Sequence, residues 1–312
     1  MGHHRHQDGA RRGQRRDLPA ASLMAWWWLP ALVAAGWTAL NFAIRRGLTA
    51  PRVAETTDPG ALPWDVVHLP TANEKRLFGW FIPAAPGAPA LVVMHGWGGN
   101  AEMMLPLAAP LHAAGYSQLL IDARCHGRSD GDTFASLPRF AEDIEAALAW
   151  LRGQPGIDPG ALGVIGHSVG AGAALLVASR QPELRAVVSL AAFAHPAAIM
   201  RRWLATQHIP YWPLGAYILA YVQHVIGFRF DAIAPRNTIA RVACPVLLVH
   251  GLEDDTVPVA EAREIHAARL SDAVELLLIP GSHDDYGDIG LQIAGLRGFL
   301  DRAFAGPAPS RA

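Results

Sequence analysis

A serine stands in a short turn between a strand-like run and a helix-like run. The apolar run at 162–166 ends in a glycine, Ser168 follows after His167, and Gly170 leads into small residues that favour a helix. This Gly-x-Ser-x-Gly arrangement predicts a sharp bend that exposes the Ser168 hydroxyl at the end of a sheet. Only small neighbours leave room for such a bend, and we expect Gly172 to let the helix approach the sheet closely. The chemistry indicated is nucleophilic attack by a serine.

A serine hydroxyl is a weak nucleophile at neutral pH, so it needs a base within hydrogen-bond reach and a third group that holds the base. Of the 14 histidines, His283 alone combines a position just after a predicted strand with the chain order serine, acid, histidine. Three acidic residues follow the strand predicted over 246–250, namely Glu253, Asp254 and Asp255. Their spacing leaves open which of the three orients His283.

A glycine-rich loop at 95–100 lies between a predicted strand and a predicted helix. Its glycines let backbone amides approach a developing negative charge, and the amides of Trp97 and Val169 are the natural pair of donors. The Trp97 side chain is then free to shape a pocket for an acyl group. His95 and His250, each before a glycine at a strand end, are expected to hold loops by hydrogen bonds, and His167 is expected to be structural.

The elements around these residues alternate between apolar strands and amphipathic helices. Strands are predicted over 64–70, 76–83, 90–95, 118–122, 162–166, Ala186–Leu190, 246–250 and Val274–Ile279, and helices over 101–114, Leu137–Arg152, 171–180, 260–270 and 289–304. The first two strands bracket a turn at 72–74 and read as a hairpin. The alternation predicts an α/β fold with a mostly parallel sheet covered by helices on both faces.

Residues 194–241 interrupt this alternation and are too long and too apolar for a bare loop. We predict a small helical lid over the strand ends where Ser168 emerges. Its aromatic residues either line a substrate pocket or pack the lid onto the core. The pocket candidates are Trp203, Tyr211, Trp212 and Tyr217, together with Trp97 and His167.

No charged residue interrupts the stretch 23–44, and about 20 apolar residues suffice to span a bilayer. Tryptophans 26–28 suit the headgroup zone, and Arg45 and Arg46 close the far side. This predicts a transmembrane signal anchor, with a cleaved signal peptide or a soluble helix as alternatives. A polar basic tail at 1–22 precedes it, a linker at 45–63 follows, and a C-terminal tail at 305–312 ends the chain. Denser arginines before the span favour a catalytic domain outside the cytoplasm.

The composition narrows the classes of function further. The chain has 312 residues, of which 51% are hydrophobic and 17% charged, and its net charge of −1 gives no reason to expect nucleic acid as a partner. The two cysteines, Cys125 and Cys244, cannot build a disulfide framework and lie in no metal-ligand spacing. The serine chemistry indicated above implies neither a metal nor a cofactor.

Five motifs in this order resemble the α/β-hydrolase superfamily, and the likeness covers roughly residues 64–304. They lie at 95–99, 122–131, 166–170, 250–258 and 281–283. The resemblance implies a catalytic triad of Ser168, His283 and, among the three acids, Asp254, which stands three residues before Val257. The stretch 122–131 is similar to the family's Asp-x-Arg-Gly-His-Gly-x-Ser loop, with Cys125 where glycine is usual, and is expected to support the site.

With its apolar N-terminus, the chain looks most like the membrane-anchored serine esterases of that superfamily. The resemblance implies cleavage of carboxylic esters or thioesters, and the apolar lid favours small-molecule or lipid substrates with apolar acyl groups. Peptide or amide hydrolysis, and cofactor-free lyase or perhydrolase chemistry, are alternatives on the same residues. A catalytically silent binding protein is the alternative from another class. The serine argues against epoxide hydrolases and dehalogenases, which use an aspartate nucleophile.

Overall fold

The computed structural model describes residues 20–284 and 289–306, with side chains from Trp27 in the first helix and from Ile293 in the last. Most of the predicted tails at 1–22 and 305–312 therefore lies outside the described residues. The chain divides into two units between Ala43 and Ile44.

The N-terminal apolar stretch is a single helix, α1 (Ala20–Gly47), which carries Arg45 and Arg46 in its last turn. Within the described residues, the part from Trp27 to Gly47 is the one helix long and apolar enough to cross a membrane, and a signal sequence would meet the same criterion. The helix extends three residues beyond the predicted span of 23–44 at each end.

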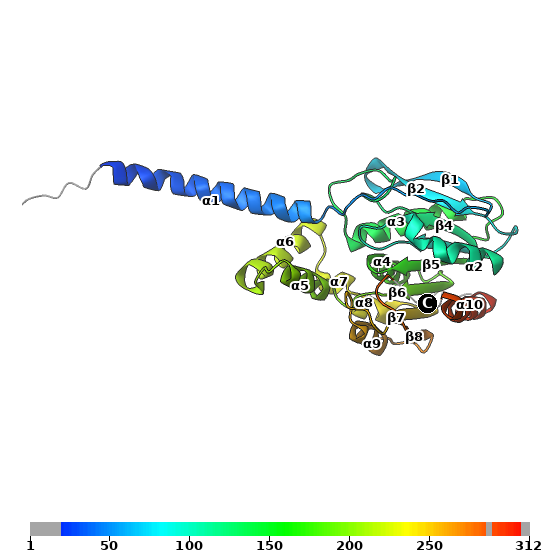
Figure 1. Cartoon of the computed structure of the whole chain (residues 1–312). Coiled ribbons are helices and arrows are strands. Elements are labelled where there is room, and N and C mark those ends of the chain that lie inside the picture. The colour runs from blue at the N-terminus through cyan, green and yellow to red at the C-terminus, as the bar shows by residue number, and fades with distance from the viewer. Residues whose placement is uncertain (1–19, 285–288, 307–312) are drawn as a thin grey trace, which may run out of the picture. The chain divides into compact units, whose positions relative to one another are not determined.

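The second unit is built on one sheet of eight strands in the order β1-β2-β4-β3-β5-β6-β7-β8 (Figure 1). The strands are β1 (Asp65–Thr71), β2 (Lys75–Ile82), β3 (Ala90–Met94), β4 (Ser117–Ile121), β5 (Leu162–His167), β6 (Ala186–Leu190), β7 (Val246–Gly251) and β8 (Val274–Ile279). β2 pairs antiparallel with β1 and β4, and every other pairing is parallel. The predicted α/β fold with a mostly parallel sheet is confirmed.

Helices cover both faces of this sheet (Figure 1). A 3₁₀ segment η2 (Ala101–Leu107), α2 (Ala108–Ala113) and α10 (Ile289–Ala305) share one apolar core cluster with side chains of the strands. Helices α3 (Leu137–Arg152) and α4 (Val169–Ala178) pack against each other on the other face, and α9 (Val259–Ala267) lies beside β7. Every residue of α4 is buried. Its alanines and glycines allow this close packing.

The segment between β6 and β7 is helical, as predicted for the lid. It contains α5 (Pro196–Thr206), the short π-helical turn η3 (Tyr211–Gly215), α6 (Ala216–Ile226), α7 (Phe230–Ile233), α8 (Pro235–Thr238) and η4 (Ile239–Arg241). Phe230 and Ile233 turn into the core, whereas Trp203 and Trp212 stay exposed.

The segment at 45–63 differs from a free linker, because its first part is bound to the second unit. The amide of Ala135 donates to the carbonyl of Leu48 at 2.9 Å, and Arg52 Nε donates to the carbonyl of Gly127 at 2.9 Å. Glu55 is buried and pairs with Arg128 at 2.8 Å. Its proline and threonine content prevents regular secondary structure but does not prevent packing.

Candidate active site

The Gly-x-Ser-x-Gly turn places Ser168 in a strained backbone conformation between β5 and α4. Its φ and ψ are 53° and −114°, a region that L residues rarely adopt. A side chain on Gly166 would overlap the carbonyl of Gly170, and one on Gly170 would overlap the carbonyl of His95. Gly172 was predicted to let the helix approach the sheet closely, and this prediction was wrong. The glycine faces Leu137 of α3 instead of the sheet.

The structure brings Ser168, His283 and Asp254 into one hydrogen-bonded row. His283 Nε2 lies 3.0 Å from Ser168 Oγ, and His283 Nδ1 lies 2.7 Å from Asp254 Oδ2. The three residues follow β5, β8 and β7, whose parallel pairing brings their carboxyl ends to the same edge of the sheet. His283 and Asp254 are buried.

The turn after β7 selects Asp254 among the three acids. Its Oδ1 accepts hydrogen bonds from the amides of Thr256 at 3.0 Å and Val257 at 2.7 Å. Glu253 instead accepts from the amide of Gly281 at 2.5 Å, and Asp255 is exposed. Only Asp254 therefore reaches the ring of His283.

Burial opposes ionisation of Asp254, but hydrogen bonds from His250, from His283 and from the amide of Val257 outweigh it. Together they hold the pKa of this carboxyl well below its ordinary value. The contact from His250, whose Nε2 lies 3.3 Å from Asp254 Oδ2 and 2.7 Å from the carbonyl of Val257, was not predicted beyond a general role in holding a loop. The acid is thus ionised throughout the neutral range.

The amide of Ser168 donates to the carbonyl of Leu190 at 2.8 Å, so it is not available to an oxyanion. Within the described chain, the amides of Trp97 and Val169 make no hydrogen bond. Val169 begins α4, where the first amides of a helix lack partners. A side chain on Gly96 would come within 3.2 Å of Ser168 Cβ, which places the 95–100 loop directly against the serine. These two amides are therefore free to donate to an oxyanion, as their prediction from the sequence requires.

His95 joins the 95–100 loop to the next loop of the site. It is fully buried, and burial, with a smaller contribution from His126, lowers its pKa to about 3. Its Nδ1 lies 2.6 Å from the carbonyl of Gly96, and its Nε2 accepts from the amide of Ala123 at 3.0 Å. A neutral ring with the proton on Nδ1 satisfies both bonds, as its expected role in holding loops requires.

The 122–131 loop is linked by hydrogen bonds to the start of η2 and within itself. Asp122 accepts hydrogen bonds from the amides of Ala101 and Arg128, each at 2.7 Å. Burial and a hydrogen bond with Glu55 raise the pKa of Asp122 to about 8. Cys125, at the position where the family usually has glycine, has a φ of 68°. This left-handed backbone explains the usual glycine.

A cavity of about 120 Å³ lies beside the row. Its walls include His167 together with Met103, Leu107, Leu190, Val249 and Ile293. The other predicted pocket residues do not line it: Trp97, Trp203, Tyr211, Trp212 and Tyr217. Trp97 is 42% exposed and lies edge-on to His126, with ring centroids 5.9 Å apart.

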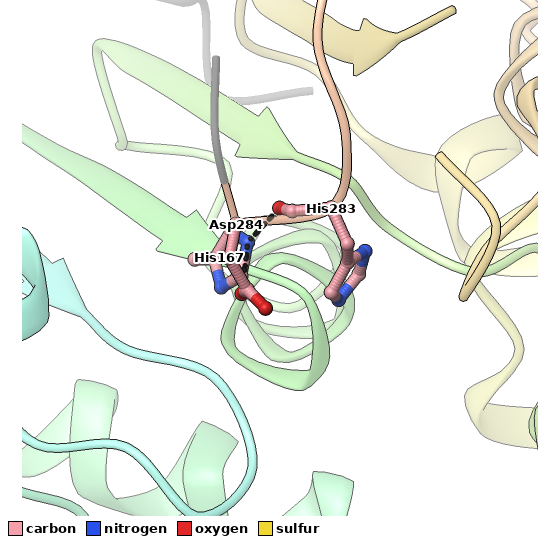
Figure 2. A group of neighbouring side chains, drawn as sticks. All are labelled: His167, His283 and Asp284. Atoms are coloured by element: carbon pink, nitrogen blue, oxygen red, sulfur yellow. Dashed lines mark hydrogen bonds and ion pairs between the residues drawn. The ribbon is translucent and has the colours of Figure 1, made fainter. Parts of the chain in front are cut away.

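By residue type, His167, His283 and Asp284 could hold a metal ion, because one ligand atom of each lies within 4.8 Å of the others. Figure 2 shows His167 Nε2 directed at the carbonyl of His283, at 3.0 Å, and the centroids of the two rings lie 5.1 Å apart. Both ring nitrogens of His283 are engaged by Asp254 and Ser168. This geometry favours His167 as a support for the His283 loop over a metal centre.

Comparisons with known proteins agree with the α/β fold of the second unit. A family model described as serine aminopeptidase, S33, matches residues 86–224. The uncharacterized protein Rv2307c of Mycobacterium tuberculosis is 32% identical over 71% of this chain and 72% of its own length. The thiohydrolase aneE of Aspergillus aculeatus is 32% identical over 43% of each chain. A solved esterase of Pyrococcus furiosus superposes with a TM-score of 0.66 at 23% identity and covers 81% of this chain and 97% of its own.

Proposed function

The chain belongs to the α/β-hydrolase superfamily, and from that premise we propose that it is a serine hydrolase that cleaves carboxylic esters or thioesters. The observation that carries the proposal is the row of Ser168, His283 and Asp254, with contacts of 3.0 and 2.7 Å. The thiohydrolase among the relatives supports thioesters as one form of the substrate.

Ser168 Oγ attacks the carbonyl carbon while His283 Nε2 takes its proton. The negative charge that develops on the carbonyl oxygen is held by the amides of Trp97 and Val169. His283 then passes the proton to the leaving alcohol or thiol. The bond between the carbonyl carbon and this group breaks, and the acyl group stays bound to Ser168 Oγ. A water molecule, deprotonated by His283, releases the acid and restores the serine. Asp254 keeps the ring oriented and stabilises its charged form.

Apolar acyl groups fit this site better than an amino group does. Of the described residues that line the cavity, His167 alone has a polar side chain, and its Nε2 faces the carbonyl of His283. An aminopeptidase would need an acceptor for the substrate ammonium group inside this cavity, and the carboxylate of Asp284, 3.9 Å from His167 Nε2, is exposed and does not line it. Aminoacyl p-nitroanilides, tested beside p-nitrophenyl esters, separate the two activities, and faster cleavage of the anilides would contradict the ester proposal.

The test of the mechanism is labelling of the full chain by a fluorophosphonate, followed by hydrolysis of p-nitrophenyl esters. Ser168→Ala should lose the label and at least about 10³-fold of the activity, because no other group replaces the nucleophile. Ser271→Ala, outside the site, is the matched control and should retain both. Absence of labelling in the unaltered protein would favour a binding protein on this fold.

We also propose that α1 anchors the chain in a membrane with the catalytic domain on the extracytoplasmic side. The length and composition of the helix support the anchor, and the arginine distribution supports the orientation. Washing membranes with alkaline carbonate should leave the full chain bound. Release of a product that lacks the segment before Arg45 would identify a cleaved signal peptide instead. Protease protection in sealed vesicles of known orientation tests the side.

A further inference from the structure

We infer that the apolar cavity between η2, the ends of β6 to β8 and α10 binds the acyl chain of the substrate. We further infer that the cavity selects acyl groups of roughly six carbons, because apolar cavities of about 150 Å³ bind benzene. The cavity here has a volume of about 120 Å³. The inference rests on the proposed function and names the substrate class of that site.

The first wall of the cavity is connected to the nucleophile through the sheet. Leu190 pairs in register with His167 on one side and with Val249 on the other, so the three lie in one row across the strand ends. All three line the cavity. The carbonyl of Leu190 also accepts the amide of Ser168 at 2.8 Å. The cavity wall therefore includes the residue next to Ser168 in the sequence, whose hydroxyl oxygen is the reacting atom.

The second wall is connected to the oxyanion loop. Met103 Sδ occupies the space into which a side chain on Gly99 would point. The methionine thus lies between the loop that presents the Trp97 amide and the interior of the cavity. It is also 46% exposed, which makes it the rim of the cavity rather than its floor. A carbonyl held by the oxyanion amides is therefore adjacent to the cavity mouth.

The chemistry of the lining fits an alkyl chain. Apart from His167, the described lining residues are apolar, and they come from η2, from three strands and from α10. Each methylene that leaves water for such a surface favours binding by about fourfold. The lid aromatics offer no comparable enclosure, since Trp203 is 52% and Trp212 is 78% exposed. The acyl chain therefore occupies the η2–α10 side of the site.

The experiment uses the full chain in lipid nanodiscs and p-nitrophenyl esters from acetyl to decanoyl. We expect kcat/KM to rise about three- to fourfold per methylene as far as hexanoyl and then to level off or fall, because further carbons leave the enclosed space. Ile293, half-buried on α10, is the position to vary. Ile293→Trp should lower the hexanoyl-to-acetyl ratio of kcat/KM at least about tenfold, because the indole fills the cavity.

Ile293→Ala, which removes volume, should move the optimum toward longer esters and provides a second test if the tryptophan variant does not fold. Leu270→Trp, at an 83% exposed position outside the cavity, is the control and should keep the original profile. A profile that moves in Trp203→Ala but in neither Ile293 variant would overturn the inference in favour of the lid. A profile without chain-length dependence in a fluorophosphonate-reactive enzyme would overturn it while the proposed function stands. Loss of both labelling and cleavage at every chain length would remove the function and this inference together.

Discussion

Asp254 presents one carboxylate oxygen to His283 and the other to the backbone. Oδ2 lies 2.7 Å from His283 Nδ1, and Oδ1 accepts the amides of Thr256 and Val257. Because a carboxylate only accepts hydrogen bonds, the proton of His283 must be on Nδ1. Nε2 is then left with a lone pair directed to Ser168 Oγ at 3.0 Å.

Asp254→Asn should lower kcat by about 10⁴-fold with little change in stability. The two backbone amides would retain the side-chain oxygen of the asparagine, so its NH₂ group would face His283 Nδ1 and force the proton onto Nε2. Ester hydrolysis and the rate of fluorophosphonate labelling measure the effect. Asp255→Asn, at an exposed position, should behave as the unaltered protein. A loss below tenfold for Asp254→Asn would contradict an orienting role.

Gly166→Ala should destabilise the protein by about 1–3 kcal/mol, because its new methyl group would overlap the carbonyl of Gly170. Displacement of Ser168 should also reduce kcat by about 10²-fold. Thermal unfolding and ester hydrolysis measure the two effects. Gly131→Ala is the control, since no atom lies within 4 Å of its added carbon. Equal behaviour of the two variants would mean that the elbow has more room than the structure shows.

Arg124→Met should cost about 3–5 kcal/mol of the free energy of unfolding, because it leaves a buried acid without its partner. Arg124 Nε lies 2.7 Å from Asp143 Oδ1, and both side chains are 1% exposed. Burial raises the pKa of Asp143 to about 6, and Arg124 opposes that rise. Urea unfolding followed by tryptophan fluorescence provides the measurement.

Arg180→Met provides the comparison for Arg124→Met. The pair of Arg180 with Glu145 is 3.4 Å long and partly exposed, so its loss should cost less than about 1 kcal/mol. Similar losses in the two variants would mean that Arg124 contributes through packing of its stem and not through its charge.

Glu55→Gln should weaken the pH dependence of stability between about pH 5 and 8. Asp122 has a pKa of about 8 in the folded protein, against an ordinary value of 3.8, first through burial and then through Glu55. The folded state therefore holds this proton more tightly than the unfolded state does. The resulting stabilisation is complete below the ordinary pKa and is lost as the pH rises through the folded value.

Replacing the Glu55 carboxyl by an amide should lower the pKa of Asp122. The pH range over which protonated Asp122 stabilises the fold then becomes narrower. The fall in Tm with rising pH, measured by scanning fluorimetry, should be smaller in Glu55→Gln than in the unaltered protein. Glu74→Gln, at an exposed position, should leave the slope as it is. A steeper slope in Glu55→Gln would contradict the contribution of Glu55 to the raised pKa of Asp122.

Much of the fold could be predicted because its signals are local. The strands Ala186–Leu190 and Val274–Ile279 and the helix Leu137–Arg152 have the predicted bounds, since apolar runs or periodic faces define them. The chain order of Ser168, Asp254 and His283 placed them after parallel strands, which end at one edge. The α/β-hydrolase resemblance supplied the choice of acid before the structure did.

What could not be predicted depends on the direction of turns and on contacts between distant segments. Glu253 and Asp255 are neighbours of Asp254 in sequence, and only the path of the backbone after β7 separates their roles. The partner of Gly172 could not be predicted, because α4 is buried on all sides. Its sequence therefore has no polar face that would indicate which side of the helix meets the sheet. The cavity joins Met103 to Ile293, 190 positions apart. No local pattern reports such a contact.

The bonds from Leu48 and Arg52 to the catalytic domain begin one residue after α1 ends at Gly47. From Leu48 onward the chain is therefore bound to the second unit, and only a short part of the predicted linker at 45–63 precedes the first of these bonds. If α1 lies in a bilayer, as proposed above, the hydrolase would meet its substrate as a two-dimensional pool. Its turnover should then follow the mole fraction of ester in the lipid, and diluting that ester with inert lipid should slow the reaction even when the total amount in the sample is constant.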